Sequence, residues 1–303
     1  MTSVEEPGLI SANDSPVPAR SRGARDFQPR SGRFLLAHPG LASGYVATCL
    51  RLGRLFVAVS LMAFGVQEAQ TSGHIGDLGL LAAWMPGHAA LAWLAAGMFL
   101  IAGLATLTGV GLRSVAAVMG VVFAVAALLR FTALIPQMGH VWPYRGVMSE
   151  LFACGAGMWM LAAQVQGAWP GDAVVRRLGA VGLAVFGVAD VVFGTIHFQV
   201  AAFIASLIPH WIPARLFLTY FTGTALLAAG LAFLARRWVR AAGLWLGLMF
   251  FLWVVLLHAS RIAHALHDSD EWNSGFVCLC MAGCALLAAA LPLRSARQQP
   301  ADA

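Results

Sequence analysis

Histidine, arginine and carboxylate side chains recur at short spacing toward the C-terminal part of the sequence. His258, Arg261, His264 and His267 follow one another at every third position, and Glu271 comes four residues later. Neighbours three residues apart share a helical face, so these groups could act together. Imidazole can move protons near neutral pH, and two imidazoles with a carboxylate can hold zinc, iron or copper. The segment predicts a solvated helix end or a proton-transfer site, with metal binding at His264 and His267 as a third alternative.

Two carboxylates fall inside long apolar stretches. Glu68 and Asp190 each lie 13 or 14 residues beyond an arginine, which places them about 20 Å along a helix that rises about 1.5 Å per residue. A charge at that depth in a membrane is costly and normally has a partner or a function. We expect Arg130, at comparable depth, to pair with Glu68 or Glu150. The carboxylates either form ion bridges that lock the helices together, or bind substrate and relay protons.

A tryptophan and an arginine flank the start of another apolar stretch. Trp211 stands two residues before Pro213, and Arg215 follows two residues later. Tryptophan at a membrane interface and proline in a first helical turn explain the first two residues without any function. A guanidinium near a helix N-terminus could hold an anion or a quinone carbonyl. Arg215 and Trp211 are therefore candidate substrate-binding residues.

The cysteines form no Cys-x-x-Cys motif, and four of the five lie in apolar stretches, where thiols usually pack inertly. Cys280 and Cys284 share one helical face at a spacing of four. The five cysteines are Cys49, Cys154, Cys278, Cys280 and Cys284.

The elements that must position these residues are membrane-spanning helices. The chain has 60% hydrophobic and 11% charged residues and a mean hydropathy of +0.78, whereas soluble domains carry about 25% charged residues. The basic residues are all arginine and occur in short runs between apolar stretches. That pattern is typical of topology determinants and excludes a nucleic-acid binder. An all-α polytopic protein is predicted, with spans near 50–70, 88–110, 114–134, 147–166, 178–197, 213–235, 241–260 and 273–292.

Arginine distribution orients these spans. Fifteen arginines fall on one side of the predicted membrane and four on the other, which predicts that both termini are cytoplasmic. Eight of the nine histidines and seven of the acids fall toward the outer side, so polar chemistry is expected there. We predict an integral protein of the cytoplasmic (inner) membrane. Residues 41–50 either lie in the membrane interface or begin the first helix. The predicted segments are a disordered basic tail (1–46), two four-helix units (47–170 and 171–292) and a short C-terminal tail (293–303).

The two units are related by an internal repeat. At an offset of 127, Leu100-x-Ala-Gly-Leu-Ala-x-Leu falls on Leu227-x-Ala-Gly-Leu-Ala-x-Leu, and Arg113, Gly120 and Phe123 fall on Arg240, Gly247 and Phe250. At an offset of 122, Phe64-Gly-Val-Gln-Glu matches Phe186-Gly-Val-Ala-Asp. Four spans per unit keep both units in the same orientation, so we expect two parallel-oriented repeats about an axis along the membrane normal.

The second unit also carries a family-like string. It contains Phe186-Gly187, His197-Phe198, Ile208-Pro-His-Trp-Ile-Pro-Ala-Arg215, Tyr220-Phe-Thr-Gly223 and Ala229-Gly230. This string resembles the DoxX and DoxX-like family of four-helix membrane proteins, well over 178–290 and more weakly over 51–166. The resemblance implies a four-helix fold and a redox setting, either thiosulfate:quinone oxidoreduction or quinone and thiol stress. It also makes a redox-active thiol the alternative to inert packing of the cysteines. Family members are usually single units, and the first unit here lacks the His-Phe pair and has His88 in place of Arg215.

Three function classes remain open. The first is an oxidoreductase component that exchanges electrons and protons with quinone or a small substrate at the outer half of the membrane. The second is a small-molecule transporter, and the third a non-catalytic membrane partner subunit. The cofactor is left open, with quinone ahead of a metal ion. The expected partners are the lipid bilayer and either quinone or a redox partner subunit. For the first class, the candidate catalytic residues are Asp190, His197, His258, Arg261 and Glu271, and the candidate substrate-binding residues are Arg215, Trp211, Glu68 and Arg130.

Overall fold

The computed structural model describes residues 39–71, 88–134, 142–165 and 172–292, and every regular element in these ranges is a helix. Eight helical segments are long and apolar enough to cross a membrane. The predicted all-α, eight-span membrane architecture is confirmed. The predicted N-terminal tail up to residue 38 and the C-terminal tail lie outside the described residues, as do His74 and His140 and the side chains of His88 and Arg130.

The helix bounds follow the predicted spans closely. In the first half of the chain they are α1 (Pro39–Thr71), α2 (His88–Thr108), α3 (Leu112–Leu134) and α4 (Trp142–Gln164). In the second half they are α5 (Asp172–Gln199), α6 (Ala201–Leu207), α7 (Arg215–Leu234), α8 (Val239–Trp253), the π-helical turn η2 (Val254–His258), α9 (Ala259–His264) and α10 (Ser269–Ala290). The seventh span thus continues from α8 through η2 into α9.

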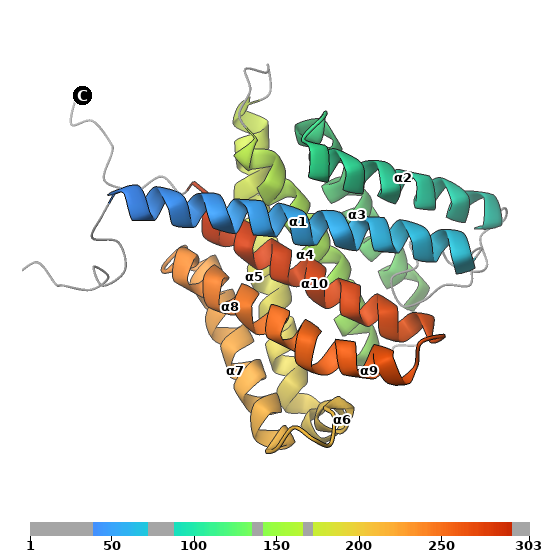
Figure 1. Ribbon diagram of the computed structural model, residues 1–303. Coiled ribbons are helices and arrows are strands. Elements are labelled where there is room, and N and C mark those ends of the chain that lie inside the picture. The colour runs from blue at the N-terminus through green and yellow to red at the C-terminus, as the bar shows by residue number, and fades with distance from the viewer. Residues whose placement is uncertain (1–38, 72–87, 135–141, 166–171, 293–303) are drawn as a thin grey trace, which may run out of the picture.

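The contacts between the spans close a ring with α10 packed against α4 across its centre. Figure 1 shows one part of this ring, in which α2, α1, α10 and α8 lie side by side. Around the ring the neighbours are α2, α1, α10, α8, α7, α5, α4 and α3, and α3 returns to α2. Across the middle, α10 packs against α4. These two helices are the most enclosed spans of the bundle, so the centre of the protein is the α4–α10 interface.

Close helix approach depends on glycine at the contact points. A Cβ atom at Gly230 on α7 would lie 2.6 Å from the carbonyl oxygen of Gly187 on α5. On α2, a Cβ at Gly103 would meet the Met62 side chain of α1 at 2.5 Å and the Ala58 carbonyl oxygen at 3.0 Å. Without a side chain these residues let two backbones touch, which is a common way of packing helices in membranes.

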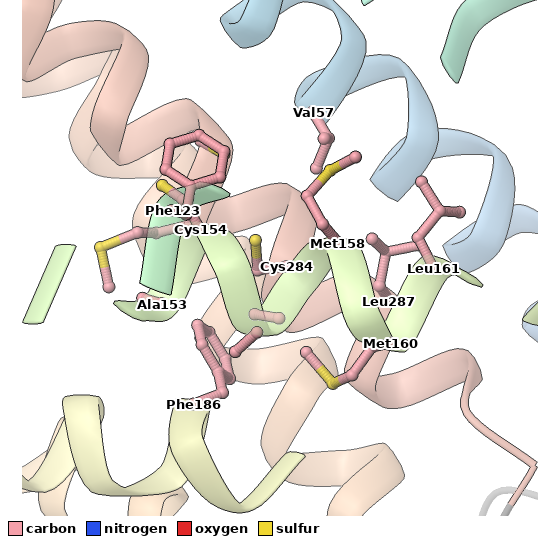
Figure 2. Packing of buried hydrophobic residues seen from close by; sticks show 14 of the residues in the cluster. Val57, Phe123, Ala153, Cys154, Met158, Met160, Leu161, Phe186, Cys284 and Leu287 are labelled. Carbon is pink, nitrogen blue, oxygen red and sulfur yellow. The ribbon is translucent and has the colours of Figure 1, made fainter. Parts of the chain in front are cut away.

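The core lies where α1, α3, α4, α5 and α10 meet. Figure 2 shows Val57, Phe123, Cys154, Phe186 and Cys284 gathered around α4 from these different helices. All five are fully buried or nearly so and belong to one hydrophobic cluster. This packed centre separates the two ends of the bundle.

Contacts along the helix pairs fix the direction of each span. Gln164 near the end of α4 donates to the Leu287 carbonyl near the end of α10 at 3.1 Å, so α4 and α10 run parallel. Gln67 near the end of α1 donates to the Ser269 carbonyl at the start of α10 at 3.3 Å, so α1 is antiparallel to α10. The end at which α4 and α10 begin, and α5 and α9 terminate, is called the polar end below.

Candidate functional site

A cavity opens at the polar end between the helices of the second half. Its volume is about 400 Å³, and its walls come from α5, α6, α7, the α8–η2–α9 span and α10, with Glu150 added from α4. Phe193, Phe250 and Trp253 give it aromatic walls. Its polar lining consists of Glu150, His197, Thr219, Thr222, His258, Arg261, Asp270, Glu271, Ser274 and Cys278. Four of the five predicted catalytic residues therefore share one chamber.

His197 stands in the last turn of α5 beside a glycine of α7. A Cβ atom at Gly223 would lie 2.8 Å from the His197 Cβ, so this glycine makes room for the histidine between the two helices. The Nδ1 atom of His197 is 2.8 Å from the Phe193 carbonyl oxygen. A carbonyl only accepts, so Nδ1 must carry a hydrogen, and in the neutral ring Nε2 is the acceptor. His197 is thus fixed in orientation with one nitrogen left for chemistry.

The π-helical turn η2 places His258 on the cavity wall. Wide turns of this kind inside α-helices occur often at functional sites, because the extra residue redirects the side chains that follow. Leu257 and His258 both line the cavity from this turn. The Nδ1 atom of His258 is buried and has no hydrogen-bond partner among the described residues. Such an atom is costly to leave unmatched and suits a ligand that can donate to it or accept from it.

Arg261 and Glu271 form an ion pair at the side of the same cavity. The Arg261 Nε donates to Glu271 Oε2 at 2.7 Å, and Nη2 donates to Oε1 in parallel. Side-chain exposure is 28% for the arginine and 15% for the glutamate. This two-point geometry fixes both planes and joins α9 to the first turn of α10. The guanidinium retains donor atoms beyond this pair and could hold an anionic or carbonyl group.

Four features of the cavity were missed by the sequence analysis. Glu150 was considered only as a partner for Arg130, and Thr222 only as part of the family-like string. The Thr222 Oγ1 is buried without a hydrogen-bond partner in the described part of the chain. The helix α6 lies in a stretch that sequence reasoning left as a connection, and it supplies Phe203, Ile204 and Leu207 to the wall. Cys278 also lines the cavity, where its thiol donates to the Phe250 carbonyl at 3.3 Å.

Asp190 lies deeper in the bundle and does not line the cavity. It is completely buried, and neither carboxyl oxygen has a hydrogen-bond partner among the described residues. The predicted ion bridge at Asp190 is not seen in the described part of the chain.

Three further predicted residues do not line the cavity. Trp211 is 62% exposed, and Arg215 begins α7 beyond the cavity wall. Glu68 belongs to α1 in the other half of the ring. The Arg130 side chain is outside the described residues, so its predicted pairing stays a prediction.

His264 and His267 turn away from His258 and Arg261. His264 is exposed and its Nδ1 is 2.6 Å from the Ser260 carbonyl oxygen. His267 is exposed and lines a separate depression between α1 and α10. Over residues 39–71, 88–134, 142–165 and 172–292, no group of three or more His, Cys, Asp or Glu side chains is arranged to hold a metal ion.

The arrangement is an amphipathic cavity, called the chamber below, with aromatic walls and two positioned imidazoles. No protein-family model, curated protein or solved structure matches the chain. The chamber is therefore interpreted from its own geometry.

Proposed function

We propose that the cavity binds a quinone headgroup, and that the chain is an integral membrane, DoxX-like oxidoreductase component acting at the outer half of the membrane. One observation carries this proposal: His197, His258 and the Arg261–Glu271 pair share a chamber that lies at one end of the bundle. Small-molecule sites are typically apolar clefts with a few convergent polar groups, and this chamber matches that description.

The lining residues fit a quinone in both shape and polarity. Phe193, Phe250 and Trp253 supply flat apolar surface for the ring. The unmatched His258 Nδ1 and Thr222 Oγ1 supply hydrogen-bonding atoms for the ring oxygens. A bound quinone takes up two electrons and two protons when it becomes quinol. His197 and His258 would hold and pass the protons, and Arg261 would orient a ring oxygen.

The electrons must come from a second reactant. The family resemblance points to a thiol or a reduced sulfur anion, or to a redox partner subunit. Oxidation of two thiols to a disulfide releases two electrons and two protons, which balances the reduction of one quinone to one quinol.

The closed part of the bundle favours binding over transport. On the side away from the polar end, Phe186, Phe233 and Leu246 are buried in a continuous apolar core. A carrier needs a route to both sides, and the polar lining of this cavity belongs to one end only. We place the arginine-rich ends of the spans in the cytoplasm, which puts the cavity on the outer side of the cytoplasmic membrane.

Quinone titration of the purified protein in mild detergent tests this function. Binding of a short-chain ubiquinone or menaquinone is followed by quenching of tryptophan fluorescence, with Trp253 in the wall as reporter. We expect His258→Ala to weaken binding about tenfold, which corresponds to about 1.4 kcal/mol.

A matched control lies in the first half of the chain. Ser114→Ala alters the groove between α2 and α3 and should leave the dissociation constant unchanged. Quinone binding with equal affinity in both variants, or no binding at all, would sink the proposal.

A further inference from the structure

Three thiols meet in the centre of the bundle, next to the cavity but outside its lining. Cys154 on α4 and Cys280 and Cys284 on α10 are each no more than 1% exposed. Figure 2 shows Cys154 and Cys284 in the same cluster of buried side chains. The Cys280 thiol interacts with the thiols of both Cys154 and Cys284.

The register of α4 against α10 explains this meeting. The two helices run parallel, and Cys284 packs directly against the bare backbone of Gly157. One helical turn earlier, α4 carries Cys154 and α10 carries Cys280. Parallel helices in contact keep the same register over one turn, so the packing alone brings these two sulfurs face to face.

Of the pairs in the cluster, Cys154 and Cys280 can form a disulfide. A disulfide needs Cβ atoms about 3.5–4.5 Å apart. Cys280 and Cys284 stand at i and i+4 of one helix, where Cβ atoms are about 5–6 Å apart. Cys154 and Cys280 lie on separate helices that approach closely and can adjust by a small movement.

Residues close in sequence to this pair line the cavity. Glu150 lines the cavity one turn before Cys154 on α4, and Met281 lines it next to Cys280 on α10. Glu150 also interacts electrostatically with Cys154. Each thiol therefore belongs to a helix that contributes to the cavity wall within one turn of the cysteine.

We infer that Cys154 and Cys280 are a redox-active dithiol that hydrogen peroxide, entering through the cavity, oxidises to a disulfide between α4 and α10. The Cys280 sulfur attacks one peroxide oxygen, the O–O bond breaks, and the products are a sulfenic acid and water. The Cys154 sulfur then attacks the Cys280 sulfur and displaces hydroxide. The hydroxide takes up the Cys154 thiol proton and leaves as a second water. Two thiols lose two electrons in all, and one peroxide becomes two waters.

This bridge would join the two halves of the chain at their centre. It would fix Glu150 of α4 relative to Cys278 and Met281 of α10, which form one side of the cavity. The inference does not depend on quinone binding.

Disulfide mapping of the full chain in detergent tests the inference. Reduced protein is treated with hydrogen peroxide, unfolded in the presence of N-ethylmaleimide, digested and analysed by mass spectrometry. We expect the free thiols to fall from five to three, with one new peptide pair that joins Cys154 to Cys280. Dithiothreitol should restore all five.

Serine variants provide matched controls. In Cys154→Ser and Cys280→Ser, peroxide should form no disulfide and the remaining thiols should stay free. Cys49→Ser and Cys278→Ser should still form the bridge. If the first two variants fail to fold, the map of the unaltered chain still decides. No loss of thiols, oxidation confined to Cys278, or a bridge through Cys284 would overturn the inference.

Discussion

The two halves of the ring share their packing and differ in their polar content. In residues 39–164, α1 packs on α2, α2 on α3, and α3 on α4; in residues 172–290, α5 packs on α7, α7 on α8, and α8 on α10. Between the halves, α1 meets α10 and α5 meets α4. Each contact thus has a counterpart, which is what the predicted duplication would produce.

The chemistry is not duplicated in the same way. The groove between α2 and α3 in the first half is about as large as the cavity, near 500 Å³, but Ser114 is the one polar side chain in its lining. At the offset of 127, His258 and Arg261 correspond to Phe131 and Leu134 in the sequence. The comparison teaches that similar helix packing in the two halves can accompany a very different polar lining of their cavities.

The largest effect on stability is expected at glycines that hold equivalent helix contacts in the two halves. Gly103→Leu and Gly230→Leu, at equivalent positions in the two halves, should each lower the free energy of unfolding by about 3 kcal/mol, because each forces apart two touching backbones. Thermal unfolding in detergent measures this. Gly97→Leu is the control, since a Cβ there meets no atom within 4 Å. Loss of stability in one half alone would break the comparison.

A smaller effect on stability is expected at the Arg261–Glu271 ion pair of the second half. Glu271→Ala should lower the free energy of unfolding by about 2 kcal/mol, because a hydrogen-bonded and partly buried guanidinium at Arg261 loses its partner. The melting temperature in detergent is the readout, and Glu271→Gln, which keeps an acceptor oxygen, should lose less. Equal melting temperatures for Glu271→Ala and the unaltered chain would contradict the role of the pair.

The smallest effect is expected at Asp190, and it has the opposite sign. Asp190→Leu should raise the free energy of unfolding by about 1 kcal/mol, because a buried polar group without a partner is replaced by an apolar one. Asp190→Asn is the matched control and should change stability less. A large loss of stability in Asp190→Leu would mean that the carboxyl has a structural partner after all.

Sequence reasoning recovered the spans and part of the candidate site, for physical reasons that differ. Helix number follows from composition and segment length, which are local properties. The chamber residues His197, His258, Arg261 and Glu271 could be grouped because all fall at one end of their spans. The other features of the chamber depend on local helix geometry and on packing between helices, which the sequence pattern does not show directly.

The histidine series illustrates that limit. Side chains three residues apart rotate by about 60° around an α-helix of 3.6 residues per turn. His258 and Arg261 therefore share the cavity wall, while His264 rotates out of it and His267 lies in the turn beyond the end of α9. The π-helical turn before His258 and the short helix α6 depend on packing between helices, and Glu150 reaches the chamber through the α4–α10 interface.

The central position of α10 has a consequence for how the protein is made. This helix is the most enclosed of the eight spans, yet the ribosome synthesises it after the other seven. Until it arrives, the faces of α1, α4 and α8 that contact it have no partner and must be shielded by lipid or by an insertion chaperone. Insertion of α10 therefore completes the centre of the bundle. Substitutions that delay it would expose the nascent protein to quality-control proteases.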